Sequence, residues 1–399
     1  MHFDTLETRN QEERDAAQML ALLAQIKTVE SQQGSCLQGG DQVKTLADLK
    51  NLPVLRKSDL VKWQAEKPPF GGMAVSNATH VFQSPGPIYE PGGSSHDWWR
   101  FGRFLTACGI GVDDIVHNCF GYHLTPAGTM FENGARAIGA TVLPAGTGQT
   151  ELQVRAAHDI GTTAYAGTPD YLKVILEKAD EMGVTLQINK AAVSGGALFP
   201  QLRQYYADRG IACLQCYATA DLGQIAYESS PTSGMIVDEG VIVEIVTPGT
   251  GDPVAHGEVG EVVVTSLNPD YPLIRFATGD LSAVMEGTSG CGRTNMRIKG
   301  WMGRADQTTK IKGMFVRPEQ VADLVARIEG ATKARVIADR DGDSDTMLVQ
   351  IEGAGINADA AASAVKDVLK LRADVQCYDD GALPRDGIVI EDRRTYDTA

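Results

Sequence analysis

The sequence predicts an α/β protein with a large N-terminal α/β domain, which includes a β-rich subdomain, and a small α+β C-terminal domain. Its 399 residues are enough for two or three domains. Short apolar strands alternate with helices through residues 114–182, a rhythm typical of a parallel sheet covered by helices. Residues 235–267 are Val and Ile runs separated by Gly turns, which predicts the β-rich subdomain.

Two helical segments and a strand are expected before the parallel sheet. Residues 11–33 carry apolar side chains at helical spacing after an acidic first turn. Residues 46–60 predict a short helix, a break at Pro53 and a second helix capped near Ser58. Neither segment suggests chemistry. Residues 80–83 predict a strand that runs into a loop rich in Gly, Pro and Ser.

The remaining elements follow in regular order. In the parallel sheet we expect strands at 114–120, 140–144 and 162–166, and helices at 130–137, 151–158 and 169–182. In the C-terminal domain we expect strands at 310–316, 334–338, 346–352 and 375–378, and helices at 319–328 and 359–371.

Polar segments follow several of these strands, at the edge of a parallel sheet where ligands bind. His123 lies beside Tyr122 after the strand at 114–120, and it could line an acyl pocket or be structural. Gly195 and Gly196 end another strand, where a flat ring could approach the backbone without meeting a Cβ atom. The alternative there is a plain strand-to-helix turn.

The Thr-Gly-Asp run at 278–280 is a further candidate. It follows an apolar strand and places a carboxylate in a turn. An ionised Asp280 could accept hydrogen bonds from the hydroxyls of a ribose. The alternative is a surface turn without a ligand.

Composition limits the partners. Lys and Arg number 36 against 51 Asp and Glu, so the formal net charge is −15. Nucleic acid and anionic membranes both need clustered cations, so we expect neither as a partner. A nucleotide ligand is compatible with this charge, because its phosphates need only a few local donors.

The cysteines and the first residues favour a reducing cytoplasm. Seven cysteines at irregular spacing do not fit a disulfide framework. Residues 1–15 are polar and acidic, so no signal peptide is expected. No apolar run approaches the roughly 18 residues of a membrane helix. Cys213 and Cys216 form a CxxC pair, but a strand would point them to opposite faces, which disfavours metal or redox use.

Three runs taken together resemble a known family. They are LIRFATGD at 273–280, GRAD at 303–306 and IKGMFVRPEQV at 311–321. In this order they resemble the late core motifs of the adenylate-forming (acyl-CoA synthetase) superfamily, and its phenylacetate–CoA ligase branch in particular. The segment LPVLRKSDL at 52–60 and GTPDYL at 167–172 are also similar to that branch.

The resemblance implies a site for ATP or AMP with Mg²⁺. Adenine would lie against Gly195, Gly196 and Ala197, and Tyr217 would stack on it, with Ala218 beside it. Thr219 would contact phosphate, Asp280 would hold the ribose and Arg304 would support nucleotide binding. Asp221 stands where the family has a Glu that ligates Mg²⁺, and its side chain is one methylene shorter. Thr219 and His123 are the candidate catalytic residues.

The resemblance also implies a mobile small domain and a CoA site. A hinge near Asp306 would separate a large domain at 1–304 from a small one at 305–399. The small domain would rotate between two half-reactions. In the second, Gly313 and Met314 would line the channel for the pantetheine arm of CoA.

Two segments depart from the family. Its phosphate-binding loop usually ends in Lys, whereas residues 84–93 have no Lys, contain three prolines without N–H groups and add the negative charge of Glu90. Ser84 and Gly86 are among the donors that remain; a rigid surface loop is the alternative. Ile388 occupies the position of a catalytic Lys. Losing a cation at developing charge typically costs about 10²–10³-fold in rate. A zinc site near Cys291 lacks enough ligands.

Three functions remain open. The first is an acyl-CoA ligase that activates a small, aryl carboxylic acid with ATP and transfers it to CoA through an acyl-adenylate. The second is an adenylation-impaired paralogue that binds AMP or acyl-CoA without efficient turnover. The third is a structural α/β protein without a nucleotide site. A homodimer is compatible with the sequence.

Overall fold

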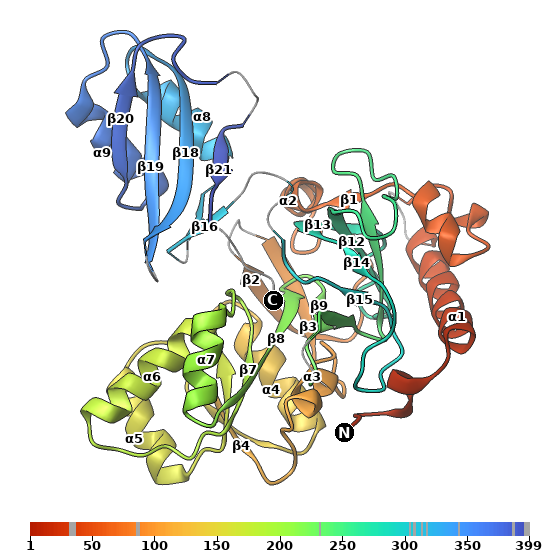
Figure 1. Ribbon diagram of the computed structural model, residues 1–399. Helices are drawn as coiled ribbons and strands as arrows, with labels where there is room; N and C mark the ends of the chain where they lie inside the picture. Colours follow the sequence, from red (N-terminus) through yellow and green to blue (C-terminus); the bar gives the residue numbers. More distant parts are fainter. Residues whose placement is uncertain are drawn as a thin grey trace. The chain divides into compact units, whose positions relative to one another are not determined.

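The computed structural model describes residues 1–31, 37–84, 88–230, 233–302, 305, 309–312, 314–316, 318–341, 344–384 and 388–394. These residues form two compact units (Figure 1). The large unit contains Met1–Thr278 and Ser282–Trp301, and the small unit contains Gly279–Leu281 and Met302–Asp397. Arg304 and Asp306 lie outside the described residues, so the boundary after residue 304 and the hinge stay predictions.

The largest sheet in the described part of the chain has nine strands, in the order β14-β15-β10-β9-β8-β7-β6-β4-β5. The five strands from β8 to β5 are parallel, as the alternation of strands and helices predicted. The other strands extend the sheet in antiparallel fashion from β8. Their bounds are β4 Ile115–Asn118, β5 Thr141–Pro144, β6 Ala164–Gly167, β7 Lys190–Val193, β8 Ala212–Thr219, β9 Gly223–Tyr227, β10 Met235–Val237, β14 Val284–Met285 and β15 Arg297–Ile298.

Helices cover both faces of the parallel strands, because alternate side chains point to opposite faces. Ala164, Ala192 and Cys216 pack with α3 and α4 on one face. Tyr165 and Cys213 pack with α6 and α7 on the other face, and α5 packs on α6. Cys213 and Cys216 therefore do point to opposite faces. The helices are α3 Gly102–Ala107, α4 Ala127–Ala137, α5 Thr150–Ile160, α6 Pro169–Glu181 and α7 Pro200–Asp208.

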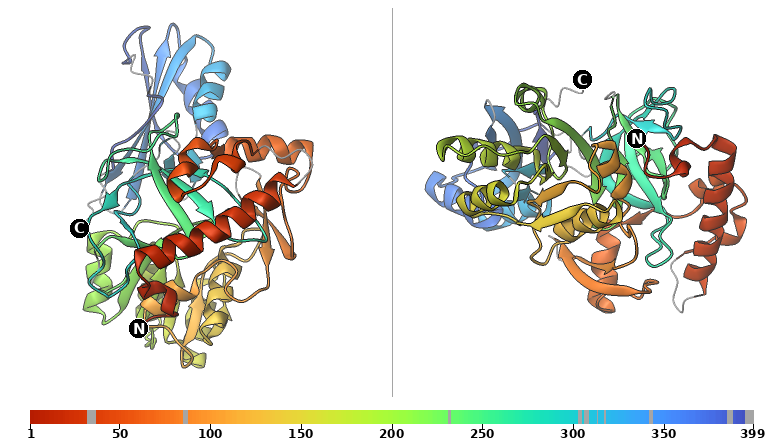
Figure 2. Two further views of the ribbon diagram at one scale, coloured as in Figure 1. Left: turned by 90° about the vertical axis from the view of Figure 1, so that its right-hand side faces the viewer. Right: turned by 90° about the horizontal axis from the view of Figure 1, so that it is seen from below.

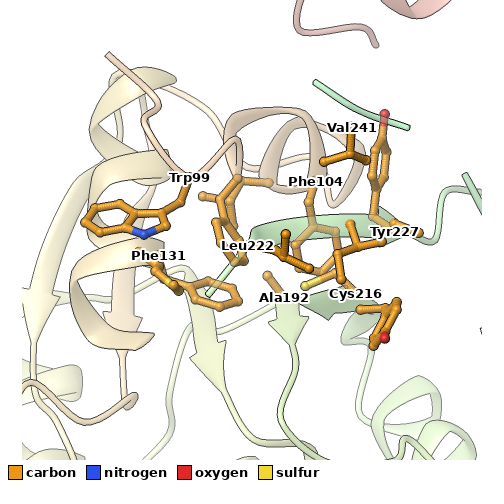
Figure 3. Close-up of a cluster of buried hydrophobic side chains, with 14 of the residues drawn as sticks. Trp99, Phe104, Phe131, Ala192, Cys216, Leu222, Tyr227 and Val241 are labelled. Carbon is orange, nitrogen blue, oxygen red and sulfur yellow. The ribbon is translucent and has the colours of Figure 1, made fainter. Parts of the chain in front are cut away.

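The core on the α3/α4 side is rich in aromatic rings. Figure 3 shows Trp99, Phe104 and Phe131 from the helical side above Ala192 and Cys216 of the strands. The Phe101 and Phe131 ring centroids lie 4.5 Å apart. Small residues in the strands leave room for these large rings, which are buried in this layer.

A second sheet of four described strands runs in the order β1-β13-β12-β11, and α1 packs on it through Leu22 and Ile26 (Figure 2). One expectation here is wrong. The Thr-Gly-Asp run is not a turn but lies inside β13, with Asp280 only 7% exposed. The bounds are α1 Gln11–Glu30, β1 Leu55–Arg56, β11 Val241–Val246, β12 Gly260–Ser266 and β13 Phe276–Ser282. Short 3-10 helices are Thr5–Thr8, Gly40–Gln42 and Leu46–Asn51.

The segment around residues 84–93 also differs from expectation. It was predicted as a loop, but β2 Ala78–Ser84 and β3 Ile88–Gly93 form an antiparallel hairpin. Helix α2 Lys57–Glu66 lies beside β3, and it begins just before the expected cap at Ser58. The Asp59 carboxylate accepts a hydrogen bond from the Arg56 backbone N–H at 3.1 Å, which fixes this helix start.

The small unit is an α+β layer, as predicted. Four described strands follow the order β20-β19-β18-β21, and α8 and α9 pack together on the sheet through one apolar cluster. The single strand expected at 310–316 is a hairpin of two strands, and β21 was not expected. The bounds are β16 Thr309–Ile311, β17 Met314–Val316, α8 Pro318–Arg327, β18 Ala331–Asp341, β19 Ser344–Gly353, α9 Ala358–Leu369, β20 Asp374–Tyr378 and β21 Ile390–Asp392.

No described helix in either unit combines the length and the apolar character needed to cross a membrane.

Candidate active site

The carboxyl ends of β4, β6, β7 and β8 lie at one edge of the parallel sheet, since these strands are neighbours that run in the same direction. The segments that leave this edge are those singled out in the sequence. They are residues 122–123 after β4, 167–172 after β6, 195–197 after β7 and 217–219 at the end of β8. The fold thus gathers separated motifs where open α/β sheets bind ligands.

Hydrogen bonds join the segment after β7 to the end of β8. The Ser194 hydroxyl donates to the backbone carbonyl of Cys216 at 3.1 Å, and the Leu198 N–H donates to Gln215 Oε1 at 3.3 Å. Gly195 has a φ of +73° and is exposed. This left-handed conformation favours glycine and leaves an uncovered stretch of backbone beside Tyr217, which is 8% exposed.

The turn between β8 and β9 presents Thr219 and Asp221. The Thr219 hydroxyl accepts a hydrogen bond from the Leu222 N–H at 3.2 Å. Gly223 has a φ of +73°, and a Cβ there would lie 2.9 Å from the carbonyl oxygen of Trp99. The Gln224 N–H donates to that same carbonyl at 3.1 Å. The turn is therefore fastened to the backbone at Trp99, which fixes the position of Asp221.

Asp221 is buried and forms an ion pair. Lys57 Nζ, at the start of α2, lies 2.9 Å from Asp221 Oδ2, and the two side chains are 40% and 1% exposed. Asp221 Oδ1 is buried without a hydrogen-bond partner among the described residues. From the sequence we predicted no chemistry for the segment that holds Lys57. A Lys at position 57 was visible, but no spacing rule links it to a residue 164 positions away.

Glu90 is buried beside this pair. Its Oε1 accepts a hydrogen bond from the Ser84 hydroxyl, and its Oε2 has no partner among the described residues. Burial, together with the nearby charge of Asp221, raises the pKa of Glu90 to about 8. Near pH 7 this carboxyl group is therefore mostly neutral. The negative charge that we assigned to Glu90 from the sequence is wrong near pH 7, because burial disfavours ionisation.

Tyr271 completes a group that we call the Glu90/Asp221 cluster, formed by Lys57, Ser84, Glu90, Asp221 and Tyr271. The Tyr271 side chain is buried, and its hydroxyl has no partner within the described chain. Burial and the charges of Asp221 and Glu90 raise its pKa well above the usual value. The cluster thus holds three buried oxygen atoms whose hydrogen-bonding capacity is not used by the described protein atoms.

The hairpin that carries Glu90 is held firmly. The Gln64 side chain donates to the Tyr89 carbonyl and accepts from the Tyr89 N–H, both at 2.8 Å. A Cβ added at Gly92 would lie 2.5 Å from the Phe82 ring and 2.7 Å from the Trp99 ring. Only glycine allows these rings to lie on the strand, so the hairpin is part of the packed interior.

The segment after β4 has a buried and an exposed part. Asn118 Nδ2 donates to the Tyr122 hydroxyl and to the Gly128 carbonyl, both at 2.8 Å. His123 is exposed, and Leu124 has a φ of +64° with 57% exposure. Tyr122 is thus held by the sheet, whereas His123 is not enclosed by the large unit.

Comparison with known proteins gives consistent relatives. No protein-family model matches the chain. Phenylacetate–coenzyme A ligase from Thermus thermophilus is 29% identical over 326 residues, which cover 77% of this chain and 72% of that protein. The enzyme of the same name from Escherichia coli is 29% identical over 335 residues, or 78% and 74% of the two chains. A structure of 2-hydroxyisobutyryl-CoA ligase with 2-HIB-AMP and CoA aligns with a TM-score of 0.79 at 23% identity, over 98% and 92%.

The chain resembles the phenylacetate–CoA ligase-like branch of the adenylate-forming superfamily in sequence over about three quarters of its length. The relatives carry this resemblance in sequence, and the solved structure supports the fold. The resemblance seen in the sequence is therefore confirmed.

Within this phenylacetate–CoA ligase-like chain, the large unit brings together part of the expected site. Nine of the expected residues lie at the sheet edge, in the turn or at the hairpin. These are Ser84, His123, Gly195, Gly196, Ala197, Tyr217, Ala218, Thr219 and Asp221. Asp280 and Met314 belong to the small unit, where Met314 is 40% exposed in β17. Gly86, Arg304 and Gly313 lie outside the described residues.

Metal ligands are sparse among the residues that the structure describes. Within the described ranges, no group of three or more His, Cys, Asp or Glu side chains could hold a metal ion. Cys291 accepts a hydrogen bond from the Ser289 hydroxyl at 3.1 Å. Although burial raises its pKa, hydrogen bonds from Ser229, Ser289 and Arg293 lower the pKa of Cys291 to about 7. At the cluster, Asp221 Oδ1 is buried without a partner among the described residues, and a carboxylate oxygen is a ligand that Mg²⁺ often takes together with phosphate oxygens.

Proposed function

We propose that the chain is an AMP-forming acid–CoA ligase. A carboxylate oxygen would attack the α-phosphorus of ATP and release pyrophosphate. The CoA sulfur would then attack the acyl carbon, and the bond to AMP would break. The observation that carries this proposal is the gathering of residues 195–197, 217–219 and 221 at one edge of the large unit. Relatives named phenylacetate–coenzyme A ligase support it.

The proposed nucleotide site uses both exposed backbone and charge. Adenine would lie on the uncovered backbone at Gly195 and Gly196, beside Tyr217. Thr219 would contact phosphate, and Asp280 would hold the ribose. Mg²⁺ would be held by Asp221 Oδ1, where it would neutralise phosphate charge.

Lys57 is the proposed source of positive charge for the phosphates. The hairpin at 84–93 has no Lys, and the Ser84 hydroxyl is already engaged by Glu90. Lys57 Nζ lies 2.9 Å from Asp221 and is 40% exposed, so it can reach both the carboxylate and a ligand. The N-terminus of α2, where Lys57 sits, adds a favourable dipole for anions.

We further propose that the acid is small and aromatic. Tyr122 is fixed by Asn118 at 2.8 Å, and the Phe120 ring stacks on Phe131 with centroids 4.4 Å apart. Aromatic side chains at the end of β4 suit a flat ring, with which they can stack or pack edge to face. The polar hydroxyl of Tyr122 would orient the ligand.

The test is acid-dependent exchange of labelled pyrophosphate into ATP, measured without CoA. A panel of aryl and aliphatic carboxylic acids would be screened with the full chain and Mg²⁺. Exchange with aryl acids supports the proposal. Exchange with aliphatic acids alone contradicts the aryl assignment, and no exchange with any acid contradicts the ligase.

The second candidate is the adenylation-impaired paralogue. It is favoured by Ile388 in place of a Lys and by Glu90 in the hairpin. Calorimetry would then show affinity for AMP or acyl-CoA, while the exchange assay shows no turnover. Sustained CoA-ligase turnover would exclude this candidate.

A further inference from the structure

Helix α1 carries large apolar side chains on two opposite faces. Its inner face holds Leu22 and Ile26, which are 0% and 3% exposed and pack on the sheet of β1, β13, β12 and β11. Its outer face holds Leu20 and Leu23, which are 74% and 43% exposed. The left view of Figure 2 shows this helix in full at the front of the large unit. Surface helices usually present polar side chains opposite the buried face, so the outer face of α1 is unusual.

The two exposed leucines belong to a continuous row of exposed residues, which we call the α1 stripe. Its members are Glu13, Ala16, Ala17, Leu20, Leu23, Ala24 and Lys27. They recur every three or four positions, which is the spacing of neighbours on one face of a helix. The stripe is therefore apolar in its middle, acidic at its first residue and basic at its last.

The stability of the helix itself explains only part of the α1 stripe. Alanine has the highest helix propensity, and Glu13 and Lys27 lie in the first and last turns, where their charges complement the helix dipole. Neither reason applies to Leu20 and Leu23, because Lys, Gln and Glu form helices about as well as leucine does. Adjacent leucines flanked by alanines form an apolar patch, and such a patch suits a contact with another protein surface.

The α1 stripe is symmetric about Leu20. Glu13 and Lys27 lie seven positions before and after it, and the other members lie three or four positions to either side. In an antiparallel pair of α1 helices with a two-fold axis at Leu20, Glu13 of each copy meets Lys27 of the other. Leu23 of each copy then lies over Ala16 of the other, so a large side chain faces a small one. Such self-complementarity is what a two-fold dimer requires.

The charges at the ends of the stripe also select the orientation of the partner. Arg14, on the inner face, pairs with Glu239 at 3.0 Å. Glu13 and Lys27 are exposed and form no ion pair within the described part of the chain. A parallel pair of helices would place Glu13 against Glu13 and Lys27 against Lys27. Like charges in contact disfavour that arrangement, whereas the antiparallel one brings opposite charges together at both ends.

We propose that a second copy of the chain binds to the α1 stripe, in an antiparallel contact of the two α1 helices around a two-fold axis at Leu20. This inference goes beyond the proposed ligase activity and does not depend on it. A contact between two single helices is smaller than the roughly 1,200–2,000 Å² of a standard interface. The dimer is therefore weak and reversible, with a Kd on the order of 10 µM.

Sedimentation velocity of the full chain from about 1 µM to about 300 µM, a range that spans this Kd, tests the inference. The wild type is expected to change from monomer to dimer as the concentration rises. Leu20→Glu should weaken the dimer about tenfold or more, because it brings two carboxylates together at the two-fold axis. Leu152→Glu is the matched control, since Leu152 is 60% exposed on α5 and lies outside the stripe. This control should dimerise as the wild type does.

Charge reversal tests the antiparallel orientation. Glu13→Lys or Lys27→Glu alone should weaken the dimer about fivefold or more, because like charges then meet at both ends of the contact. The double variant Glu13→Lys/Lys27→Glu restores opposite charges and should bind more tightly than either single variant. Recovery of this kind is expected only if the partner carries the same two substitutions, as a second copy does.

Three outcomes overturn the inference. They are a wild type that stays monomeric at every concentration, a dimer that Leu20→Glu leaves unchanged, and a double charge variant that dimerises no better than the single variants. Circular dichroism of each variant separates loss of the helix from loss of the contact. At low concentration, where the chain is monomeric, variants at Leu20 should unfold like the wild type, because this side chain is 74% exposed.

Discussion

The β8 and β9 turn and the β2 and β3 hairpin both contribute to the Glu90/Asp221 cluster, but they do so in opposite ways. The turn keeps Ala218 and Thr219 partly exposed and matches the pattern of the family. The hairpin buries Ser84 and Glu90, and each satisfies part of the other's hydrogen-bonding capacity. The segment that would hold phosphates has thus become part of the interior, while the segment beside it still faces the sheet edge.

This contrast separates two requirements that a nucleotide site usually combines. Positioning of a base and ribose depends on backbone and flat surfaces, and these persist at Gly195 and Tyr217. Charge for the phosphates depends on cations and N–H donors. The sequence of the hairpin has no Lys or Arg, and its Tyr89 N–H already donates to Gln64. Lys57, at the start of α2, supplies a cation within the Glu90/Asp221 cluster.

Removing the Trp99 ring, which packs against the β2 and β3 hairpin, should have the largest effect on the free energy of unfolding. Trp99 is 2% exposed, and its ring packs on Gly92 and Phe82. Trp99→Ala is expected to lower the free energy of unfolding by about 3–5 kcal/mol. Denaturant unfolding measures this, with Leu20→Ala as the exposed control on α1. A loss below about 1 kcal/mol would show that the hairpin is not anchored by this ring.

Restoring the missing lysine tests whether charge limits the first half-reaction. Ile388→Lys is expected to raise the rate of pyrophosphate exchange by about 10²-fold, because it returns a cation to the developing negative charge. Ile388→Met is the control for side-chain length. If Ile388→Lys leaves the rate unchanged, the buried hairpin rather than position 388 limits adenylation.

Removing the charge of Lys57 tests the proposed substitute for the loop lysine. Lys57→Gln is expected to weaken ATP binding about tenfold and AMP binding much less, because AMP lacks the β- and γ-phosphates. Calorimetry with both nucleotides measures the difference. Lys62→Gln is the matched control, since Lys62 is exposed on the same helix. Equal weakening of ATP and AMP would contradict a phosphate role for Lys57.

The smallest expected effect is a change in how the stability of the folded state depends on pH. Burial raises the pKa of Glu90 from 4.5 to about 8, so between these values the folded state holds a proton that the unfolded state has released. The contribution of Glu90 to the free energy of unfolding is therefore complete below pH 4.5 and is lost as pH rises toward 8. Glu90→Gln keeps a partner for Ser84 and should flatten this slope, so that the variant becomes more stable than the wild type as pH rises toward 8.

Thermal unfolding from pH 5 to pH 9 checks this expectation. Glu66→Gln on α2 removes an exposed carboxylate and serves as the control. The assignment of the slope to Glu90 fails if Glu90→Gln and the wild type keep the same slope.

Local patterns predicted the parallel sheet and the segments at its edge, because strand and helix periodicity and paired glycines are visible in short windows. The pair Gly195 and Gly196 could be recognised in the sequence without any knowledge of distant residues. The hairpin was missed because Pro91, Gly92 and Gly93 break most strands. They form β3 here because Trp98 and Trp99, which follow the hairpin in sequence, occupy the space of the absent side chains.

Two features of the Glu90/Asp221 cluster could be recognised only in the folded structure. Lys57 and Asp221 are 164 positions apart, and no pattern in either segment predicts that the two side chains are in contact. The charge state of Glu90 depends on its burial by the surrounding elements, and this burial cannot be predicted from composition. Asp280 was expected in a turn because Thr-Gly-Asp is typical of turns, yet β13 continues through it with Gly279 at a φ of +74°.

The glycines of β3 limit which side chains the hairpin can carry. Any side chain at Gly93 would lie 2.3 Å from the Trp98 ring, and any at Gly92 would meet Phe82 and Trp99. A substitution at either position would first have to displace an indole ring. A cation could therefore not be introduced at Gly92 or Gly93 without repacking this part of the core.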